Sequence, residues 1–265
     1  MEVCIIPTGG LCNRMRAMAS GISIAKKYNM KAVIYWNNNN GLKADFKNLF
    51  LPIPDDDITI VENRKWLYRI GCTKDYIKRW IPINCLYKTT YNYNIYNNDG
   101  HSLILSPSEK NLLISCNSMT PEYNLKSLFR PKASLQTRID RITQHFPPNT
   151  IGVHIRRTDN VQSIERSPLK SFIKRMEREI QKDETVKFYL ATDDEDVKQN
   201  LLHFFANHII SYPGCINRNN LEGMEFAVVE LFCLSRTQRI IGSDYSSYSQ
   251  MAAEIGGIEL EYAHS

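Results

Sequence analysis

The stretch Ile151-Gly152-Val153-His154-Ile155-Arg156-Arg157-Thr158-Asp159 decides how this chain is read. It begins as a short apolar run after two prolines, and such a run beside turn residues predicts a buried strand. Side chains alternate along a strand, so we expect His154 and Arg156 on one face and Arg157 on the other. Arginine at the end of a strand suits an anion, because its planar guanidinium donates two parallel hydrogen bonds and stays charged at any working pH. The stretch predicts a phosphate-holding site, and a surface ion pair with Asp159 is the alternative.

The rest of the chain alternates short apolar runs, which predict strands, with longer amphipathic segments, which predict helices. We expect strands at 1–6, 32–36, 58–61, 112–116, 151–155, 186–191, 208–211, 239–241 and 258–260. We expect helices at 13–28, 135–146, 168–180, 194–205, 224–235 and 246–255. Ser167 is expected to cap the helix at 168–180, with Pro168 in its first turn. Residues 87–100 show neither periodicity and predict an irregular loop.

Strands that alternate with helices predict an α/β fold whose parallel sheets are covered on both faces. Such sheets bind ligands beyond the carboxyl ends of their strands. The pair Pro147-Pro148 predicts a boundary between an N-terminal α/β domain at 1–147 and a C-terminal Rossmann-like domain at 148–265. With 265 residues, each half is long enough to bury a core of its own.

The composition argues against several classes of protein. The net charge of +5 is mild and dispersed, which suits an anionic small ligand and disfavours nucleic acid as a partner. The seven cysteines form no CxxC pair and no zinc-like spacing, so we expect free thiols in a reduced, cytoplasmic setting. No apolar stretch approaches membrane-spanning length, so we expect a soluble protein or one held to a membrane only peripherally.

Two further loops follow predicted strands. In Gly9-Gly10-Leu11-Cys12-Asn13-Arg14, glycine lets the backbone approach a ligand and the helix start offers N–H groups to an anion. Gly10 and Asn13 are therefore candidates, with a plain tight turn as the alternative. In Ala191-Thr192-Asp193-Asp194, the two aspartates either contact a ligand or cap the next helix. Because a helix dipole favours consecutive carboxylates in the first turn, we predict no metal site there.

The segment Ser243-Asp244-Tyr245-Ser246-Ser247-Tyr248 runs from a strand into a helix. Its serines can present hydroxyl and backbone N–H groups to a phosphate, and helix capping by Ser246 is compatible with that role. Glu230 lies among apolar residues on the helix at 224–235, so its carboxylate either reaches solvent or pairs with N–H donors of a ligand. Together the loops predict a pyrophosphate clamp with a separate group that recognises the base.

These motifs, in this order, resemble the superfamily of GDP-fucose-dependent fucosyltransferases. That superfamily includes the core α1,6-fucosyltransferases of N-glycans, the bacterial nodulation fucosyltransferases and, more distantly, the protein O-fucosyltransferases. The resemblance rests on residues 154–159, Tyr189-Leu190-Ala191-Thr192-Asp193-Asp194, Glu230 with Leu234-Ser235, and Tyr245-Ser246-Ser247 with Ala253-Glu254-Ile255. In the first half, residues 9–14, Trp36-Asn37 and Leu49-Phe50 look like related bacterial sugar transferases.

The resemblance implies a GT-B-like architecture of two Rossmann-like domains, with the donor bound mainly by the second and the acceptor by the first. It implies an inverting transferase that needs no metal or other cofactor and moves fucose from GDP-fucose to an oligosaccharide hydroxyl. By the same resemblance Arg156, with Arg157 beside it, holds the β-phosphate, and His154 lies near the nucleotide. Glu230 reads guanine. The phosphates are lined by Ser246, Ser247 and Tyr248.

The general base is the position that matches least well. Asn160 replaces a lysine of the core enzymes, and Glu165 stands about one residue from the place of their catalytic base. Glu165 is the candidate base, and Asp159 is the reserve. The alternatives are a transferase for another nucleotide sugar, a non-catalytic glycan- or nucleotide-binding protein, and an α/β protein whose arginines only form surface ion pairs.

Overall fold

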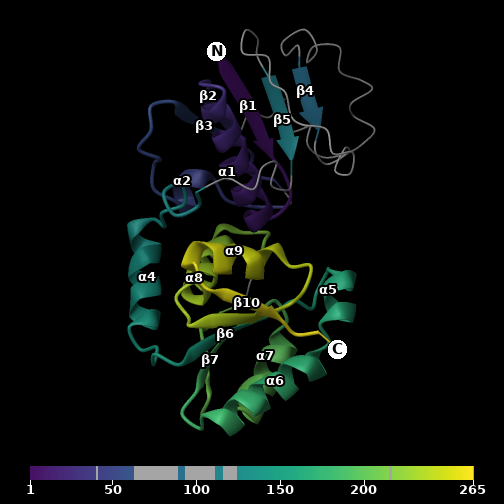
Figure 1. The fold of residues 1–265 in the computed structure, drawn as a ribbon. Helices are drawn as coiled ribbons and strands as arrows, with labels where there is room; N and C mark the ends of the chain where they lie inside the picture. The colour runs from purple at the N-terminus through teal and green to yellow at the C-terminus, as the bar shows by residue number, and fades with distance from the viewer. Residues whose placement is uncertain (40, 63–88, 93–110, 116–123, 215–216, 265) are drawn as a thin grey trace. The chain divides into compact units, whose positions relative to one another are not determined.

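The computed structural model describes residues 1–39, 41–62, 89–92, 111–115, 124–214 and 217–264 (Figure 1). The chain forms two compact units. The first comprises Met1–Lys132 with Arg218–Leu221, and the second comprises Ala133–Asn217 with Glu222–Ser265. Among the described residues, no helix is both long and apolar enough to cross a membrane.

The first unit is built on a parallel five-stranded sheet in the order β3-β2-β1-β5-β4. Its strands are β1 (Glu2–Pro7), β2 (Lys31–Trp36), β3 (Ile58–Glu62), β4 (Thr89–Asn92) and β5 (Asn111–Ser115). Its helices in the described part are α1 (Leu11–Lys27) and α2 (Phe46–Leu49). Apolar side chains of the three central strands, including Cys4, Ile6, Leu112 and Ile114, form a buried cluster.

The prediction of an irregular loop at 87–100 was wrong in part, because β4 lies within it. The strand pairs with β5, from Thr89 opposite Asn111 to Asn92 opposite Ile114. Tertiary pairing supplies the backbone hydrogen bonds of an edge strand, so its own sequence need not alternate. The rest of that segment, and the basic and aromatic stretch at 64–80, lie outside the described residues.

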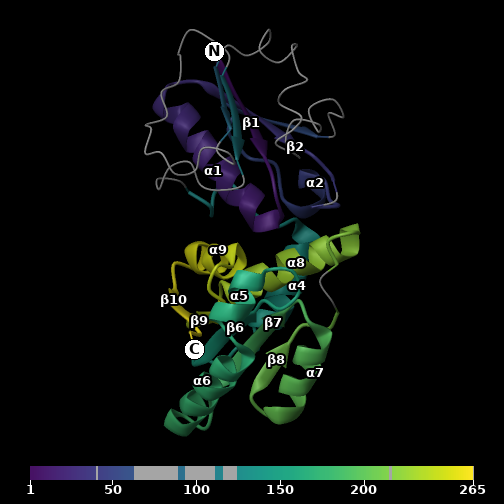
Figure 2. The same ribbon diagram turned by 90° about the vertical axis from the view of Figure 1, so that its right-hand side faces the viewer.

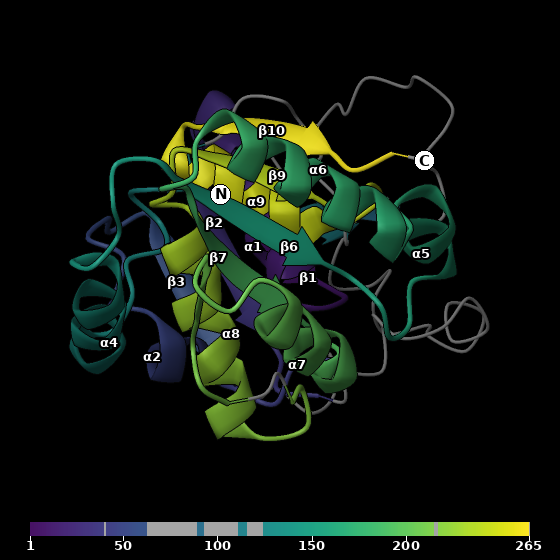
Figure 3. The ribbon, with the colours of Figure 1, turned by 90° about the horizontal axis from the view of Figure 1, so that it is seen from below.

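The second unit holds a second parallel sheet, in the order β10-β9-β6-β7-β8 (Figure 3). Its strands are β6 (Thr150–Ile155), β7 (Lys187–Thr192), β8 (Ile209–Ser211), β9 (Arg239–Gly242) and β10 (Glu259–Tyr262). Its helices are α4 (Ala133–Thr143), α5 (Val161–Arg166), α6 (Leu169–Lys182), α7 (Glu195–Phe204), α8 (Leu221–Leu234) and α9 (Ser247–Gly256). Every residue of β6 is buried, as expected for the central strand of a covered sheet.

Helices α6 and α7 cover one face of this sheet, and α8 and α9 cover the other (Figure 2). This layering follows from right-handed crossovers. The chain steps from β6 through β7 to β8 in one direction, and then returns to the other side of β6 to form β9 and β10. Reversal of direction changes the face that the connecting helices cover, and it leaves a switch point between β6 and β9.

The units divide at Lys132/Ala133, earlier in the chain than the predicted boundary at 147/148. Helix α4 belongs with the second unit because its side chains pair with residues of α8 and the turn that follows it. Arg138 forms an ion pair with Glu225, and Asp140 forms one with Arg236. The proline pair is not a linker: Thr150 donates its N–H and its hydroxyl to the Pro147 carbonyl, which makes a turn into β6.

Helix α5 was not predicted, and it changes the start of α6. The Asn160 side chain accepts a hydrogen bond from the Ser163 N–H at 3.1 Å and so caps α5. Ser167, expected to cap α6, instead ends α5, and Pro168 occupies the capping position of α6. The short helix occupies the chain between the arginine stretch and α6.

Candidate functional site

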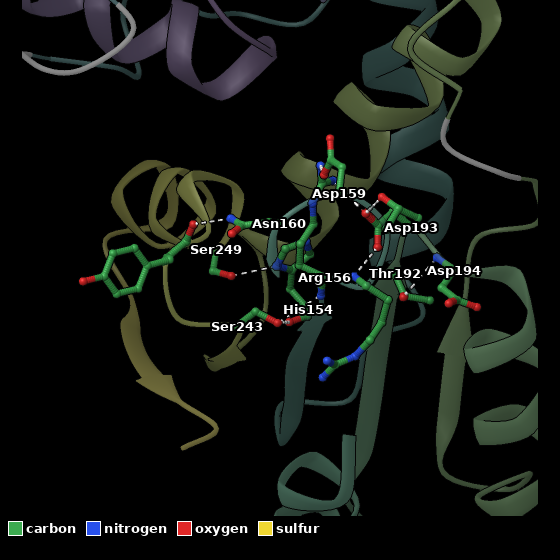
Figure 4. Close-up of polar contacts among 12 residues, drawn as sticks. His154, Arg156, Asp159, Asn160, Thr192, Asp193, Asp194, Ser243 and Ser249 are labelled. Carbon is green, nitrogen blue, oxygen red and sulfur yellow. Dashed lines mark hydrogen bonds and ion pairs between the residues drawn. The ribbon is translucent and has the colours of Figure 1, made fainter. Parts of the chain in front are cut away.

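The candidate site lies at the carboxyl edge of the second sheet, at its switch point (Figure 4). His154 of β6 is in register with Ala191 of β7 and with Gly242 of β9. The loops after these three strands therefore leave the sheet at the same edge. A parallel sheet of this topology binds its ligands at such a place.

The ends of β6 and β9 are joined by hydrogen bonds through Ser243. The Ser243 N–H donates to the His154 carbonyl at 3.1 Å. The Ser243 hydroxyl accepts the Arg156 N–H at 3.0 Å. The backbone of Arg156 is thereby fixed where the strand ends, so its side chain starts from a defined position.

The guanidinium of Arg156 contacts two carboxylates (Figure 4). It lies 2.8 Å from Asp193 and also pairs with Asp159. The Arg156 side chain is 17% exposed, that of Asp193 only 5%, and that of Asp159 55%. Arg156 is thus fixed on one side by a buried acid and reaches solvent beside an exposed one.

Asp193 organises the loop after β6. Besides its ion pair with Arg156, it accepts the Arg157 N–H at 2.7 Å and the Thr158 hydroxyl at 2.5 Å. Its neighbour Asp194 caps α7 by accepting the Val197 N–H at 2.9 Å. Both aspartates, predicted to contact a donor, are engaged in loop and helix structure. Over the described residues, no cluster of three or more His, Cys, Asp or Glu side chains is arranged to hold a metal ion.

The side chain of Arg157 holds α5 in place. It donates to the carbonyls of Ile164 and Ser167 at the carboxyl end of that helix, where a cation is favourable. Its guanidinium also lies 5.9 Å from the centre of the Phe172 ring of α6. Burial lowers the pKa of Arg157, with Asp193 and Asp194 acting in the opposite direction. Arg156 and Arg157 therefore make separate sets of contacts.

His154 is buried and clamps α9 to the sheet. Its Nδ1 lies 2.7 Å from the Ser249 hydroxyl, and its ring stacks on Tyr248 with 4.8 Å between ring centres. The Tyr248 hydroxyl donates to the Ala227 carbonyl at 2.5 Å, which ties α9 to α8. Burial, and then the charge of Arg156, lower the pKa of His154 to about 3, so the imidazole is neutral near pH 7.

The serine loop opens α9 without a side-chain cap. Ser246 occupies the N-cap position and is buried, yet its hydroxyl accepts no capping hydrogen bond. In contrast, Asn160 and Asp194 both cap their helices. Ser247 follows as the first residue of α9 and is partly exposed. The amino end of this helix therefore combines hydroxyl groups with the positive end of a helix dipole.

Glu230 is fully enclosed on α8, and its Oε2 atom has no hydrogen-bond partner. Burial raises the pKa of Glu230 well above its usual value, and the charge of Lys198 opposes that rise. The Lys198 ammonium donates to the carbonyls of Tyr212 and Gly214 at 2.8 and 3.0 Å. An unpaired buried acceptor is costly unless another group satisfies it.

The remaining predicted residues are Glu165 in the second unit and Gly10 and Asn13 in the first. Glu165 is exposed on α5. Gly10 caps α1 in the first unit, and a Cβ added there would meet nothing within 4 Å. Gly9 is the position in this loop where the backbone requires glycine, because its φ of +81° lies in the left-handed region. The Asn13 side chain accepts a hydrogen bond from Arg16 at 3.1 Å.

Two residues of the cluster were not predicted from the sequence as site residues. Asn160 caps α5 and also donates from Nδ2 to the Tyr245 carbonyl at 2.8 Å. Tyr245 has a left-handed backbone, with φ of +55°, and is 51% exposed. An asparagine just before an amphipathic segment is a helix-start signal, so the sequence could have indicated the capping role of Asn160. The conformation of Tyr245 had no such signal.

Comparison with known proteins gives matches in structure only. No protein-family model and no curated protein matches the chain. Its structure is similar to NodZ α-1,6-fucosyltransferase soaked with GDP-fucose, with 17% identity, a TM-score of 0.62, and coverage of 96% of this chain and 92% of that one. NodZ from Bradyrhizobium, at 15% identity and a TM-score of 0.63, covers 95% and 92%. A mutant of Arabidopsis thaliana FUT1 with GDP, at 14% identity and a TM-score of 0.57, covers 98% and 69%.

Structures of POFUT1 are also similar to this chain. POFUT1 in complex with GDP is 9% identical to this chain, with a TM-score of 0.56 and coverage of 98% of this chain and 97% of that one. The GT-B-like fold of two Rossmann-like parallel sheets, predicted from the sequence, is confirmed. The similar structures belong to the superfamily that the sequence motifs resemble. At these identities the similarity establishes the fold.

Proposed function

We propose that this protein is an inverting glycosyltransferase that moves fucose from GDP-fucose to a hydroxyl of a glycan. The observation that supports it most is the placement of Arg156 and an uncapped serine loop together at the switch point of the second sheet. Structures with this fold have been solved with GDP and with GDP-fucose. The second unit binds the donor in this proposal, and the first contributes to the binding of the acceptor.

The diphosphate of the donor replaces Asp159 as the partner of Arg156. An exposed ion pair three residues apart contributes little stability, so a doubly charged anion can displace it. Asp193 stays in place because it is buried and also bonded to the Arg157 N–H. Arg156 then carries the negative charge that gathers on the leaving GDP as the bond to the sugar breaks.

The amino end of α9 provides the second half of the clamp. The hydroxyls of Ser246 and Ser247 and the first N–H groups of the helix are suitable donors for phosphate oxygens. His154 and Tyr248 hold this helix end against β6, so the donors are fixed before the ligand arrives. With Arg156, these groups take the part that a divalent cation plays in other transferases, which supports a reaction without metal.

Glu230 is proposed to recognise guanine by accepting hydrogen bonds from the base. Guanine presents two adjacent N–H donors on one edge, and the unpaired Oε2 of Glu230 needs a donor. Because such a contact favours the charged carboxylate, binding of the base is expected to lower the raised pKa of Glu230. This contact favours a guanine nucleotide over other nucleotides but leaves the sugar open, so another GDP-sugar is the second candidate donor.

Glu165 is the proposed general base, because its exposed carboxylate on α5 follows the arginine stretch. Asp159 is held by Arg156 and is the reserve. Gly10 and Asn13 remain proposed donor contacts from the first unit, where the open space beside Gly10 fits a close approach. Cys233 is a buried free thiol, which fits the proposed reduced, cytoplasmic setting.

The test is incubation of the protein with radiolabelled GDP-fucose and an array of oligosaccharides, with and without EDTA. The expected result is label on one class of oligosaccharide, at equal rates in both conditions. A parallel thermal-shift panel of nucleotide sugars separates GDP-fucose from other donors. Loss of transfer in EDTA would contradict the metal-independent mechanism, and absence of any shift with GDP would contradict the whole proposal. In the same assay, a Glu165→Gln enzyme that keeps full activity at neutral pH would remove the base assignment.

A further inference from the structure

Tyr245 is an exposed aromatic residue in an unfavourable backbone conformation. Its φ of +55° lies in the left-handed region, which residues with bulky side chains rarely adopt. Its side chain nevertheless stays accessible, since the residue is 51% exposed. A strained residue persists only where its surroundings hold it, and such residues gather at functional sites.

Three contacts hold Tyr245 directly, and two more hold the residues that make them. Its carbonyl accepts from Asn160 Nδ2 at 2.8 Å, and its N–H donates to the Asp244 carboxylate at 2.8 Å. The Arg166 guanidinium lies 4.6 Å from the centre of its ring, and Arg166 also pairs with Asp244 at 3.6 Å. The Asp244 N–H donates to the Ser167 hydroxyl at 2.9 Å. The backbone of Tyr245 is therefore fixed, and its exposed ring contacts the Arg166 guanidinium.

The same contacts connect Tyr245 to the proposed phosphate clamp. It stands between Ser243, which accepts the Arg156 N–H, and Ser246, which begins α9. Asn160, which holds its carbonyl, directly follows Asp159, the exposed partner of Arg156. The ring thus projects from the loop that would line the phosphates.

We propose that Tyr245 is the platform on which a pyranose ring of the acceptor glycan packs. One face of a pyranose carries C–H groups that suit the negative face of an aromatic ring, and a tyrosine side chain loses little conformational entropy on binding. Val161, the first residue of α5, is also largely exposed and adds apolar surface next to Asn160. This inference rests on the proposed transferase function, and it assigns a specificity residue to the acceptor.

The exposure of Tyr245 favours the acceptor over the donor sugar. A donor sugar must be shielded from water to avoid hydrolysis, so its pocket is expected to be enclosed. An acceptor residue is part of a longer glycan that enters from solvent. A half-exposed ring fits the second case.

The experiment compares Tyr245→Ala and Tyr245→Phe in steady-state kinetics with GDP-fucose and the oligosaccharide that accepts label. Phe204→Ala is the matched control, because Phe204 is an exposed aromatic residue, at 70%, on α7. We expect Tyr245→Ala to raise the acceptor KM about tenfold, the upper part of what one aromatic contact contributes. Tyr245→Phe and the control should stay within about twofold, and the donor KM should not change in any variant.

Tyr245→Gly separates loss of the ring from misfolding, because glycine relieves the left-handed strain while removing the side chain. It should show the acceptor KM of Tyr245→Ala with an unchanged thermal shift on GDP. An unchanged acceptor KM in both variants overturns the proposal, and so does a rise in the donor KM instead.

Saturation-transfer NMR distinguishes failure of this proposal from failure of the transferase function. The probes are oligosaccharides of glucose, galactose, mannose and N-acetylglucosamine, measured with and without GDP. If the wild type binds one of them and Tyr245→Ala loses the signal, packing of the glycan on Tyr245 is supported even when GDP-fucose is not turned over. If no oligosaccharide contacts the wild type in either condition, or if the signal survives in Tyr245→Ala, the platform is wrong.

Discussion

Two arginines follow the first strands of the two sheets, and the structure uses them differently. Arg14 lies in the first turns of α1, directly after β1, and is buried. Its guanidinium donates to the Gly9 and Asn37 carbonyls and to Asn39 Oδ1, at 2.8 Å for Gly9 and 2.6 Å for Asn39. Arg156 follows β6 and remains 17% exposed, between one buried and one exposed carboxylate.

In the proposed function, the same topology serves structure in one unit and binding in the other. Arg14 joins the loops after β1 and β2 by meeting backbone and amide oxygens. Arg156 has a partner, Asp159, that a stronger anion can replace. Whether an arginine at a sheet edge binds a ligand therefore depends on how replaceable its partners are.

Removal of Arg156 should have the largest effect on function. We expect Arg156→Ala to lower turnover about a hundredfold or more, since one fixed donor to a developing charge is worth roughly 3 kcal/mol. Arg178→Ala, an exposed arginine on α6, is the control and should keep full activity. Initial rates with GDP-fucose measure the effect, and a fall of less than tenfold would mean that Arg156 does not hold the leaving group.

Removal of Arg14 should instead lower stability. Arg14→Met removes the donor to the Gly9 carbonyl and to the buried Asn37 carbonyl, which is expected to cost about 2–3 kcal/mol of unfolding free energy. Denaturant titration measures it, with Arg16→Met, at a less buried position of the same helix, as the control. If Arg14→Met is as stable as the wild type but no longer shifts with GDP, the contrast between the two arginines is wrong.

The protein should also lose stability in mild acid, because the buried His154 of the second sheet is neutral when folded. Its pKa is about 3 in the folded protein, against about 6.5 when unfolded. Between these pH values the unfolded chain binds a proton at His154 and the folded protein does not. The contribution of the neutral His154 to the free energy of unfolding is complete above pH 6.5 and is lost as the pH falls towards 3. Between pH 7 and 5 the loss amounts to about 2 kcal/mol. His154→Gln, which cannot titrate, should show a shallower decline in chemical denaturation at the two pH values; an equal decline would contradict the assignment.

GDP affinity should rise with pH because of Glu230. Its pKa is raised in the free protein and is expected to fall when guanine donates to it, so binding releases a proton. Below the pKa of the free form, the affinity should improve by up to about tenfold per pH unit. Calorimetry in buffers of different ionisation enthalpy measures the released proton, and Glu230→Gln should release none. Proton uptake on binding would rule out recognition of guanine by the Glu230 carboxylate.

The smallest effect is expected at Asp159. Asp159→Asn frees Arg156 from an exposed pair worth less than about 1 kcal/mol, so the affinity for GDP should stay equal or improve up to about fivefold. Asp193→Asn, at the buried partner, should weaken GDP binding because Arg156 loses its buried counter-charge and one of the two accepting oxygens becomes an NH2 donor. If Asp159→Asn keeps GDP affinity but loses turnover, Asp159 rather than Glu165 is the base.

The sequence predicted the parts of the fold that depend on local periodicity. The buried strand β6 and the apolar stripe of α6 were found because Phe172 and Met176 repeat at helical spacing toward that strand. The strand β4 and the helix α5 were missed, because the first depends on pairing with β5 and the second is short. The boundary was misplaced because the ion pairs of α4 with the α8 region cannot be read from α4 alone.

In the candidate site, the sequence predicted which loops meet but not what each side chain does there. Arg156 and Arg157 are adjacent and chemically identical, yet only the structure shows that Arg157 is committed to the end of α5. Asp193 was predicted as a ligand contact or a cap; Asp194 is the cap, and Asp193 organises the loop after β6. These roles depend on partners distant in sequence, which a local pattern does not contain.

The assignment of Arg218–Leu221 to the first unit has a consequence for the engineering and evolution of this chain. The polypeptide passes between the units at three places, at 132/133, 217/218 and 221/222. Neither unit can therefore be exchanged with that of a relative as one continuous segment, because a single cut after Lys132 separates the first unit from its last four residues. Chimeras with altered donor or acceptor preference need two coordinated grafts, and change by point substitution in the loops is the simpler route.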